Sequence, residues 1–414
     1  MDAARLLAAA QYSKHVLLVR GVVDTARVTG HPQAGDARLG YDLLTAVQSR
    51  HPEAVDTVLR YPSVGAWARH TVRKLSEPGA PAVPGQLGAL AVAAALRSGT
   101  ACTVEVPVAE GTITIPSVGQ ILVPGGAARA TVRCTPEGAE VAGDGFRIEV
   151  SPSADGGDTP GWRPLRALTA ETDGRCLRVL IDDLDPFRMP GSAALSSRLN
   201  AMRMAYWQSA LDSAWDLLVR HHPAVADEVA TVISVFAPMT PENGGQSSAT
   251  SRETFGCVAL SEPLDGRSLA VTLAHEVQHA KLSALLDVVP LLLPDDGSRH
   301  YAPWRDDPRP LGGLLQGAYA YLGVTGFWRR QRAHEKGKAA ILASAEFAQW
   351  REAARSVSGT LAGSGRLTAA GEIFLTGMIT QLDAYAAEPV PAEALTLARE
   401  ASRLHRDRWV ERNR

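Results

Sequence analysis

The sequence has few cysteines, no excess of one charge and no long apolar run. Its cysteines, Cys102, Cys134, Cys176 and Cys257, form no CxxC pair, so they indicate neither a zinc knuckle nor the disulfide framework of a small secreted domain. Lysine and arginine number 42 against 44 acidic residues, which gives no electrostatic reason to expect a nucleic-acid or membrane partner. No run approaches the roughly 18 apolar residues that span a bilayer, and the first residues do not resemble a signal peptide. We therefore expect a cytoplasmic protein.

The 414 residues, 45% hydrophobic and 21% charged, have the composition of a globular protein large enough for several domains. Apolar residues recur at helical spacing in residues 1–100, whereas polar and apolar residues alternate between glycine-rich turns in residues 101–185. Residues 186–414 return to helical spacing. The pattern predicts an α+β protein, mostly helical, with an inserted antiparallel β subdomain between an amino-terminal helical region and a carboxy-terminal domain.

Within the carboxy-terminal domain, two short apolar segments predict strands that lie just before the most informative helix. These are residues 229–236 and residues 255–260, and the second is expected at the edge of a small sheet, where an extended peptide can add. The helix that follows is expected over residues 269–289, with Ser268 as N-cap and Pro290 as its end. Further helices are predicted over residues 311–332, 338–357, 368–382 and 391–410.

The helix over residues 269–289 carries the sequence His275-Glu276-Val277-Gln278-His279, an HExxH motif. Side chains at positions i and i+4 project from the same helix face, so His275 and His279 can bind one metal ion through their imidazole rings. Glu276 is positioned to face a metal-bound water or a substrate. Because this helix follows a strand, we expect a zincin-like arrangement in which it lies next to a small sheet. The alternative is two incidental helical histidines.

The motif itself does not supply a third ligand. In the extended pattern HExxHxxGxxH, Leu282 and Leu285 stand where glycine and histidine are required. Asp287 lies on the same helix but about 12 Å beyond His279, too far to share an ion. It is expected to make a polar contact at the end of the helix.

Other segments offer the remaining candidates for the third ligand. Asp306 and Asp307 lie in the loop after the motif helix, and Gln316 lies on the next helix, residues 311–332. In enzymes built like thermolysin the third ligand comes from a downstream helix, and the inward polar residues of this one are Gln316 and Tyr319. We expect Gln316 as third ligand, although a neutral amide is unusual in that role, and Tyr319 as a catalytic residue.

From about residue 180 to residue 330 the sequence resembles the actinobacterial HExxH peptide-modification family. The resemblance implies a 2-oxoglutarate-dependent peptide β-hydroxylase that binds Fe(II) through His275 and His279 and modifies a ribosomally synthesised precursor peptide. The carboxylate that usually completes such an iron site is not evident here. The segments that carry the resemblance are residues 182–186, 255–260, 274–287, 301–310 and 313–320.

A 2-oxoglutarate co-substrate also requires a cation for its distal carboxylate, and a guanidinium offers a bidentate partner. Arg305 and Arg309 are the expected residues. The alternative is that these arginines pair with Asp306 and Asp307 and only hold the loop.

Two other functions fit the same motif. In a zinc metallopeptidase, Glu276 removes a proton from a zinc-bound water that attacks a peptide carbonyl. In a non-enzymatic peptide-binding module, the strand at residues 255–260 pairs with an extended ligand and any metal is structural.

Overall fold

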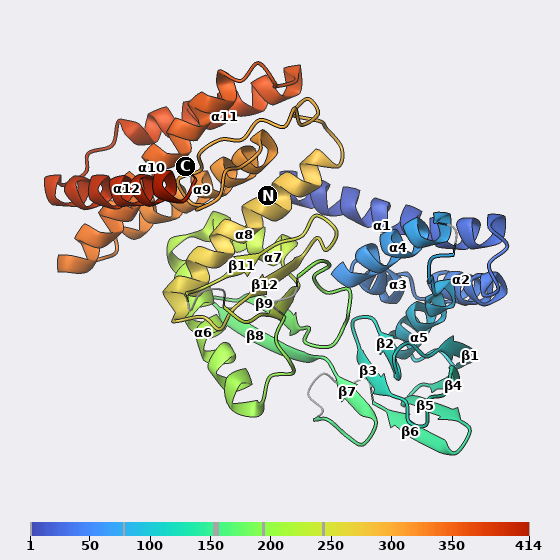
Figure 1. The fold of residues 1–414 in the computed structure, drawn as a ribbon. Coiled ribbons are helices and arrows are strands. Elements are labelled where there is room, and N and C mark those ends of the chain that lie inside the picture. The colour runs from blue at the N-terminus through green and yellow to red at the C-terminus, as the bar shows by residue number, and fades with distance from the viewer. Residues whose placement is uncertain (1, 78, 152–156, 193–194, 242–244, 414) are drawn as a thin grey trace.

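The computed structural model describes residues 2–77, 79–151, 157–192, 195–241 and 245–413. It is an α+β protein, 54% helical, as the sequence predicts. Figure 1 shows blue amino-terminal helices and small teal sheets on one side, a central sheet with its helices, and orange and red carboxy-terminal helices on the other side. Among the residues described, no helix combines the length and apolar character needed to cross a lipid bilayer.

The amino-terminal region is a packed group of helices, as predicted. Helix α5 is buried almost all round, because its alanine- and leucine-rich sequence presents no polar face, and its left-handed C-cap is Gly99. The helices are α1 (Asp2–Val28), α2 (Ala34–Gln48), α3 (Pro52–Leu59), α4 (Pro62–Ser76) and α5 (Leu87–Ser98), the last preceded by the 3-10 turn Pro84–Gln86.

Next come two small antiparallel sheets, which confirm the predicted hairpins. One has the strand order β1-β4-β5-β6 and the other β2-β3-β7. Alternate residues of β2 and β4 are buried, as expected for strands with one face on a core. The strands are β1 (Cys102–Pro107), β2 (Thr112–Ile115), β3 (Gly119–Leu122), β4 (Arg129–Thr135), β5 (Gly138–Gly143), β6 (Phe146–Val150) and β7 (Trp162–Pro164).

The last two strands of the β-rich region, β8 (Arg166–Thr172) and β9 (Arg175–Ile181), belong to a different sheet. This five-stranded sheet has the order β11-β12-β10-β9-β8, in which β10 (Val235–Pro238) is parallel to both β9 and β12 (Cys257–Leu260). Helices α6 (Ala201–His221), α7 (Pro223–Val232) and α8 (Gly266–Leu286) share one core with its apolar side chains. The β-rich region therefore contributes two strands to the sheet beside the HExxH helix.

Two predictions about this sheet are wrong. Residues 229–232, predicted as the start of a strand, are the last turn of α7, because their apolar side chains Val229 and Val232 lie on the buried helix face. The strand at residues 255–260 is not an edge: β12 lies between β10 and the short strand β11 (Ser248–Ala249), which forms the edge. The residues before β11 are polar and rich in glycine and serine, so alternation did not indicate a strand there.

The carboxy-terminal helices confirm the predicted elements to within a few residues. They are α9 (Leu311–Gln331), α10 (Gly337–Ala362), α11 (Ala369–Ala386) and α12 (Ala392–Arg412). Helix α9 packs against both α8 and α10, and so connects the central sheet region to the carboxy-terminal helices.

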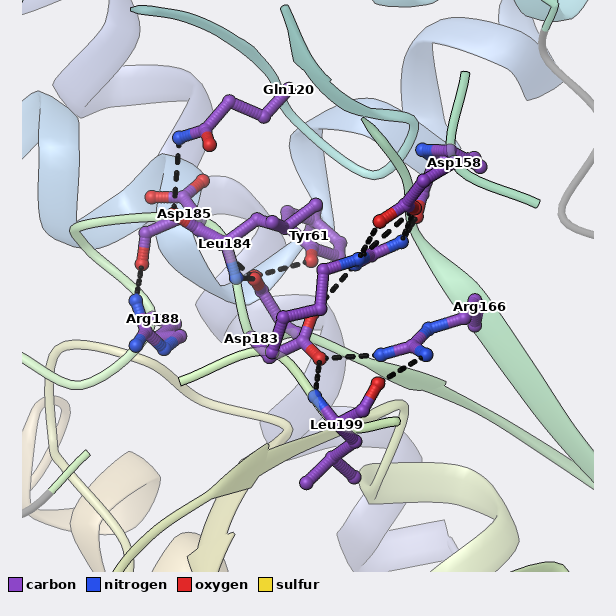
Figure 2. A network of polar contacts seen from close by, with 12 residues as sticks. Tyr61, Gln120, Asp158, Arg166, Asp183, Leu184, Asp185, Arg188 and Leu199 are labelled. Atoms are coloured by element: carbon purple, nitrogen blue, oxygen red, sulfur yellow. Dashed lines mark hydrogen bonds and ion pairs between the residues drawn. The ribbon is translucent and has the colours of Figure 1, made fainter. Parts of the chain in front are cut away.

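A cluster of three aspartates just after β9 links the amino-terminal helices to the central sheet (Figure 2). Asp182 accepts a hydrogen bond from the Tyr61 hydroxyl at 2.6 Å, and Asp185 accepts one from the Ser63 hydroxyl, also at 2.6 Å. Asp183 forms ion pairs with Arg166 at 2.6 Å and Arg198 at 2.8 Å. We call Asp182, Asp183 and Asp185 the aspartate cluster.

Candidate metal centre

The HExxH helix α8 begins with a capping box. The carboxylate of Asp265 accepts a hydrogen bond from the Ser268 amide at 2.7 Å, and the Ser268 hydroxyl contacts the Asp265 backbone in return. The N-cap is thus Asp265 rather than the predicted Ser268, and the helix starts three residues earlier. Leu269, Leu273 and Val277 recur at helical spacing and are buried against the central sheet.

The two histidines of the motif face each other. The Nε2 atom of His275 is 3.1 Å from the Nε2 atom of His279, and the rings meet at an interplanar angle of 75°. One metal ion at about 2.1 Å reaches both nitrogens at this separation. Burial lowers the pKa of His275 to about 3, so this ring is neutral at physiological pH, as a ligand must be.

Gln316 fixes the orientation of one of these rings. The Nδ1–H of His279 donates to the Gln316 carbonyl oxygen Oε1 at 3.0 Å, while the Gln316 amide nitrogen donates to the Ser283 hydroxyl at 3.2 Å. An imidazole that carries its proton on Nδ1 has its lone pair on Nε2, and this atom of His279 faces His275. This contact makes Gln316 an orienting partner of a ligand, whereas the sequence analysis expected a direct ligand.

Glu276 lies beside the histidine pair and is almost completely buried. Its Oε1 atom is 3.9 Å from His275 Nε2 and accepts a hydrogen bond from the Ser248 hydroxyl on β11 at 2.7 Å. Its Oε2 atom is buried with no hydrogen-bond partner among the residues described. Burial raises the pKa of this carboxyl group, so Glu276 can hold a proton more readily than an exposed glutamate.

A cleft of about 490 Å³ opens in front of His275. One wall is the stripe Arg267, Val271 and His275, which lie at positions i, i+4 and i+8 of α8. The edge strand β11 contributes Ser248. The opposite wall comes from α9 and α10 and contains Tyr321, Val324, Trp328, Glu346 and Trp350.

The arginines predicted to bind the co-substrate lie outside the lining of this cleft. Arg305 and Arg309 both pair with Asp307, at 2.9 Å and 3.0 Å. Asp306 pairs with Arg412 in the last helix. Arg305 and Arg309 therefore make the loop-holding contacts that were the alternative to co-substrate binding, but with Asp307 alone. Arg267 is the arginine that lines the cleft, and its only ion pair among the described residues is a 3.4 Å contact with Glu335.

Tyr319 also lies outside the cleft lining. Its ring contacts Phe374 at 5.3 Å between centroids and the Lys281 ammonium at 5.7 Å. Tyr321 lies beside the candidate site instead. The centroids of the Tyr321 and His275 rings are 5.1 Å apart, and the rings meet edge to face. Asp287 is the C-cap of α8 and pairs with Lys14 and Arg252, which confirms the predicted polar contact at the helix end.

Sequence reasoning missed Ser248, Arg267, Tyr321 and Glu346. The sequence pattern could have indicated two of them, Arg267 and Tyr321. Arg267 shares the i, i+4, i+8 stripe of His275. Tyr321 follows from the antiparallel packing of α8 and α9, since the step back from His279 to His275 on α8 is matched by the step forward from Gln316 to Tyr321 on α9. Ser248 and Glu346 come from elements whose placement against α8 is set by tertiary packing alone.

Among the residues that the structure describes, no group of three or more histidine, cysteine, aspartate or glutamate side chains is placed to hold a metal ion. His275 and His279, which face each other at 3.1 Å, remain the candidate ligand pair. Comparison with known proteins adds no further ligand, because no protein-family model and no curated protein matches this chain.

Proposed function

We propose that this protein is an Fe(II)- and 2-oxoglutarate-dependent hydroxylase that acts at Cβ of a residue in a ribosomally synthesised precursor peptide. The observation that carries the metal assignment is the pair of Nε2 atoms 3.1 Å apart, one with its lone pair directed at the other ring by Gln316, next to an open cleft. The residue types fit, since neutral imidazoles bind iron and leave positions for other reactants. The oxidative reaction rests on the sequence resemblance.

In the proposed reaction, one atom of O₂ enters the peptide C–H bond as a hydroxyl group, and the other oxidises 2-oxoglutarate to succinate and CO₂. Iron, when bound by His275 and His279, supplies the site at which O₂ is activated. Arg267 is proposed to bind the distal carboxylate of 2-oxoglutarate, because it is the arginine in the cleft wall two turns before His275 on α8.

Two features of the chain support a peptide as the substrate. The cleft is bordered by β11, the edge strand of the five-stranded sheet, and an extended peptide can add to such an edge. The HExxH helix packs on the same sheet, which supports a zincin-like arrangement. Ser248 lies on β11 and also donates a hydrogen bond to Glu276. It therefore belongs both to the sheet edge proposed to bind the peptide and to the proposed metal centre.

A zinc metallopeptidase is the second candidate, and the position of Glu276 favours it. A buried carboxylate 3.9 Å from His275 Nε2, with one oxygen unpaired, is suited to take a proton from a metal-bound water. Hydrolysis requires neither O₂ nor 2-oxoglutarate.

The decisive experiment incubates the purified protein and its precursor peptide with Fe(II), with or without 2-oxoglutarate and O₂. Hydroxylation predicts that the peptide gains the mass of one oxygen atom and that one succinate forms per turnover, only when both co-substrates are present. Peptide fragments produced under anaerobic conditions with zinc, and lost in Glu276→Gln, would support hydrolysis. An unchanged peptide with no succinate would refute the hydroxylase.

A further inference from the structure

The cleft wall opposite α8 places one carboxylate among three aromatic rings. Glu346 lies on α10, and its Oε2 atom accepts a hydrogen bond from the Trp350 indole at 2.6 Å. The Trp350 ring is 4.3 Å from Tyr321 between centroids, and Tyr321 in turn contacts His275. Trp328 lines the same cleft. We call Tyr321, Trp328, Glu346 and Trp350 the aromatic–acid subsite.

The charge of Glu346 is not neutralised by the protein. Among the described residues, no lysine, arginine or histidine forms an ion pair with it, and the Trp350 indole is its one side-chain hydrogen-bond donor. The other acid in the lining, Asp265, is engaged as the N-cap of α8. Glu346 lines the open cleft and has one oxygen engaged by Trp350, so a cationic ligand in the cleft can bond to the other oxygen in place of water.

We propose that the aromatic–acid subsite binds the side chain of an arginine in the peptide substrate; this inference rests on the proposed function. A guanidinium makes charge-assisted hydrogen bonds to a carboxylate and stacks on aromatic faces, so it satisfies both parts of the subsite at once. A lysine ammonium pairs with the carboxylate but stacks less well.

The subsite also limits where the arginine stands in the peptide. One aromatic ring, Tyr321, separates Glu346 and Trp350 from His275. An extended peptide advances about 3.3 Å per residue, and side chains two residues apart lie on the same face. The modified residue is therefore expected within about three positions of the arginine.

Two synthetic peptides of equal size test the proposal: acetyl-Ala-Ala-Arg-Ala-Ala-amide and the same peptide with citrulline, the uncharged isostere, in place of arginine. Binding to the full-length protein is measured by calorimetry without 2-oxoglutarate or O₂, so the result does not depend on any reaction. The arginine peptide is expected to bind at least about tenfold more tightly than the citrulline peptide.

Glu346→Gln is expected to abolish this difference in affinity while leaving the bound metal unchanged. The matched control is Glu352→Gln, an exposed residue on the same helix, which should preserve the difference. Thermal melting of both variants establishes that they are folded. Trp350→Leu provides a second test, since it removes the stacking surface and should weaken arginine binding about threefold or more.

Three results would overturn the proposal. They are equal affinity of the wild-type protein for the two peptides, including no measurable binding of either; retention of the difference in Glu346→Gln; and loss of bound metal in Glu346→Gln, which would make Glu346 a metal ligand. If the difference is present but no precursor peptide is hydroxylated, the subsite stands and the proposed hydroxylase reaction fails.

Discussion

The aspartate cluster and the candidate metal centre are both buried and rich in ionisable side chains, but they differ in how fully their polar groups are paired. Asp183 accepts hydrogen bonds from Arg166, Arg198 and the Leu199 amide, and its side chain has no exposed surface. Glu276 is nearly as buried, yet its Oε1 atom accepts from the Ser248 hydroxyl while its Oε2 atom has no hydrogen-bond partner among the residues described. The first arrangement holds the fold together, and the second leaves bonding capacity for reactants.

The largest expected effect is at the metal centre. His275→Ala removes one of the two proposed ligands, so the bound metal should fall below about a tenth of an equivalent and turnover should fall by about a thousandfold or more. Metal analysis and activity measurement test this. The control is His221→Ala, whose ring stacks on His334 away from the site and whose loss should leave the metal content unchanged.

In the aspartate cluster the effect should fall on stability. Asp183→Asn leaves Arg166 without its carboxylate partner, which should lower the free energy of unfolding by about 3–5 kcal/mol in urea denaturation. Asp158→Asn breaks an ion pair to Arg198 at a half-exposed carboxylate and should cost at most about 1 kcal/mol. Similar losses in the two variants would contradict the contrast between buried and exposed pairing.

A smaller effect on metal binding is expected at Gln316. Gln316→Ala removes the acceptor that orients His279, and the metal affinity should decrease by about 10- to 100-fold in a chelator competition. Gln331→Ala is the matched control, because Gln331 makes the same kind of contact at 2.9 Å with the buried ring of His222. An unchanged affinity in Gln316→Ala would remove the assigned orienting role.

The smallest effect depends on pH. Burial, together with the charge of Asp182, raises the pKa of Asp185 to about 7. Because this value lies above that in the unfolded chain, the stabilising effect of the bound proton is complete below about pH 4 and is lost as the pH rises through 7. Between pH 6 and pH 8 the wild type should therefore lose about 1.4 kcal/mol relative to Asp185→Asn. If the unfolding free energies of the two proteins depend equally on pH, the group that titrates near pH 7 is not Asp185.

The two clusters also differ in how well the sequence predicted them. The HExxH spacing on one helix places His275 and His279 together, because that proximity is a property of local helix geometry. The aspartate cluster joins residues more than a hundred positions apart, such as Tyr61 and Asp182, and only the packing of the fold brings them together. The same limit applies to Glu346 and Ser248 in the cleft.

Most helices and hairpins were predicted because apolar periodicity reports local structure, and the errors have local causes too. The short apolar run at residues 229–232 fits either a buried helix or a buried strand, so its periodicity alone does not distinguish the two. Tyr319 and Tyr321 are two positions apart on α9, and the rotation of that helix about its axis decides which of them faces His275. The axial rotation of a helix is determined by its neighbours.

The hydroxyl groups of Tyr61 and Ser63, at the start of α4, contact two of the carboxylates that directly follow β9. A fragment that begins near residue 180 would expose those acids and the apolar faces beside them. The candidate site is thus not an independent unit: if it were produced alone, the carboxylates of Asp182 and Asp185 would lose the hydroxyl groups of Tyr61 and Ser63.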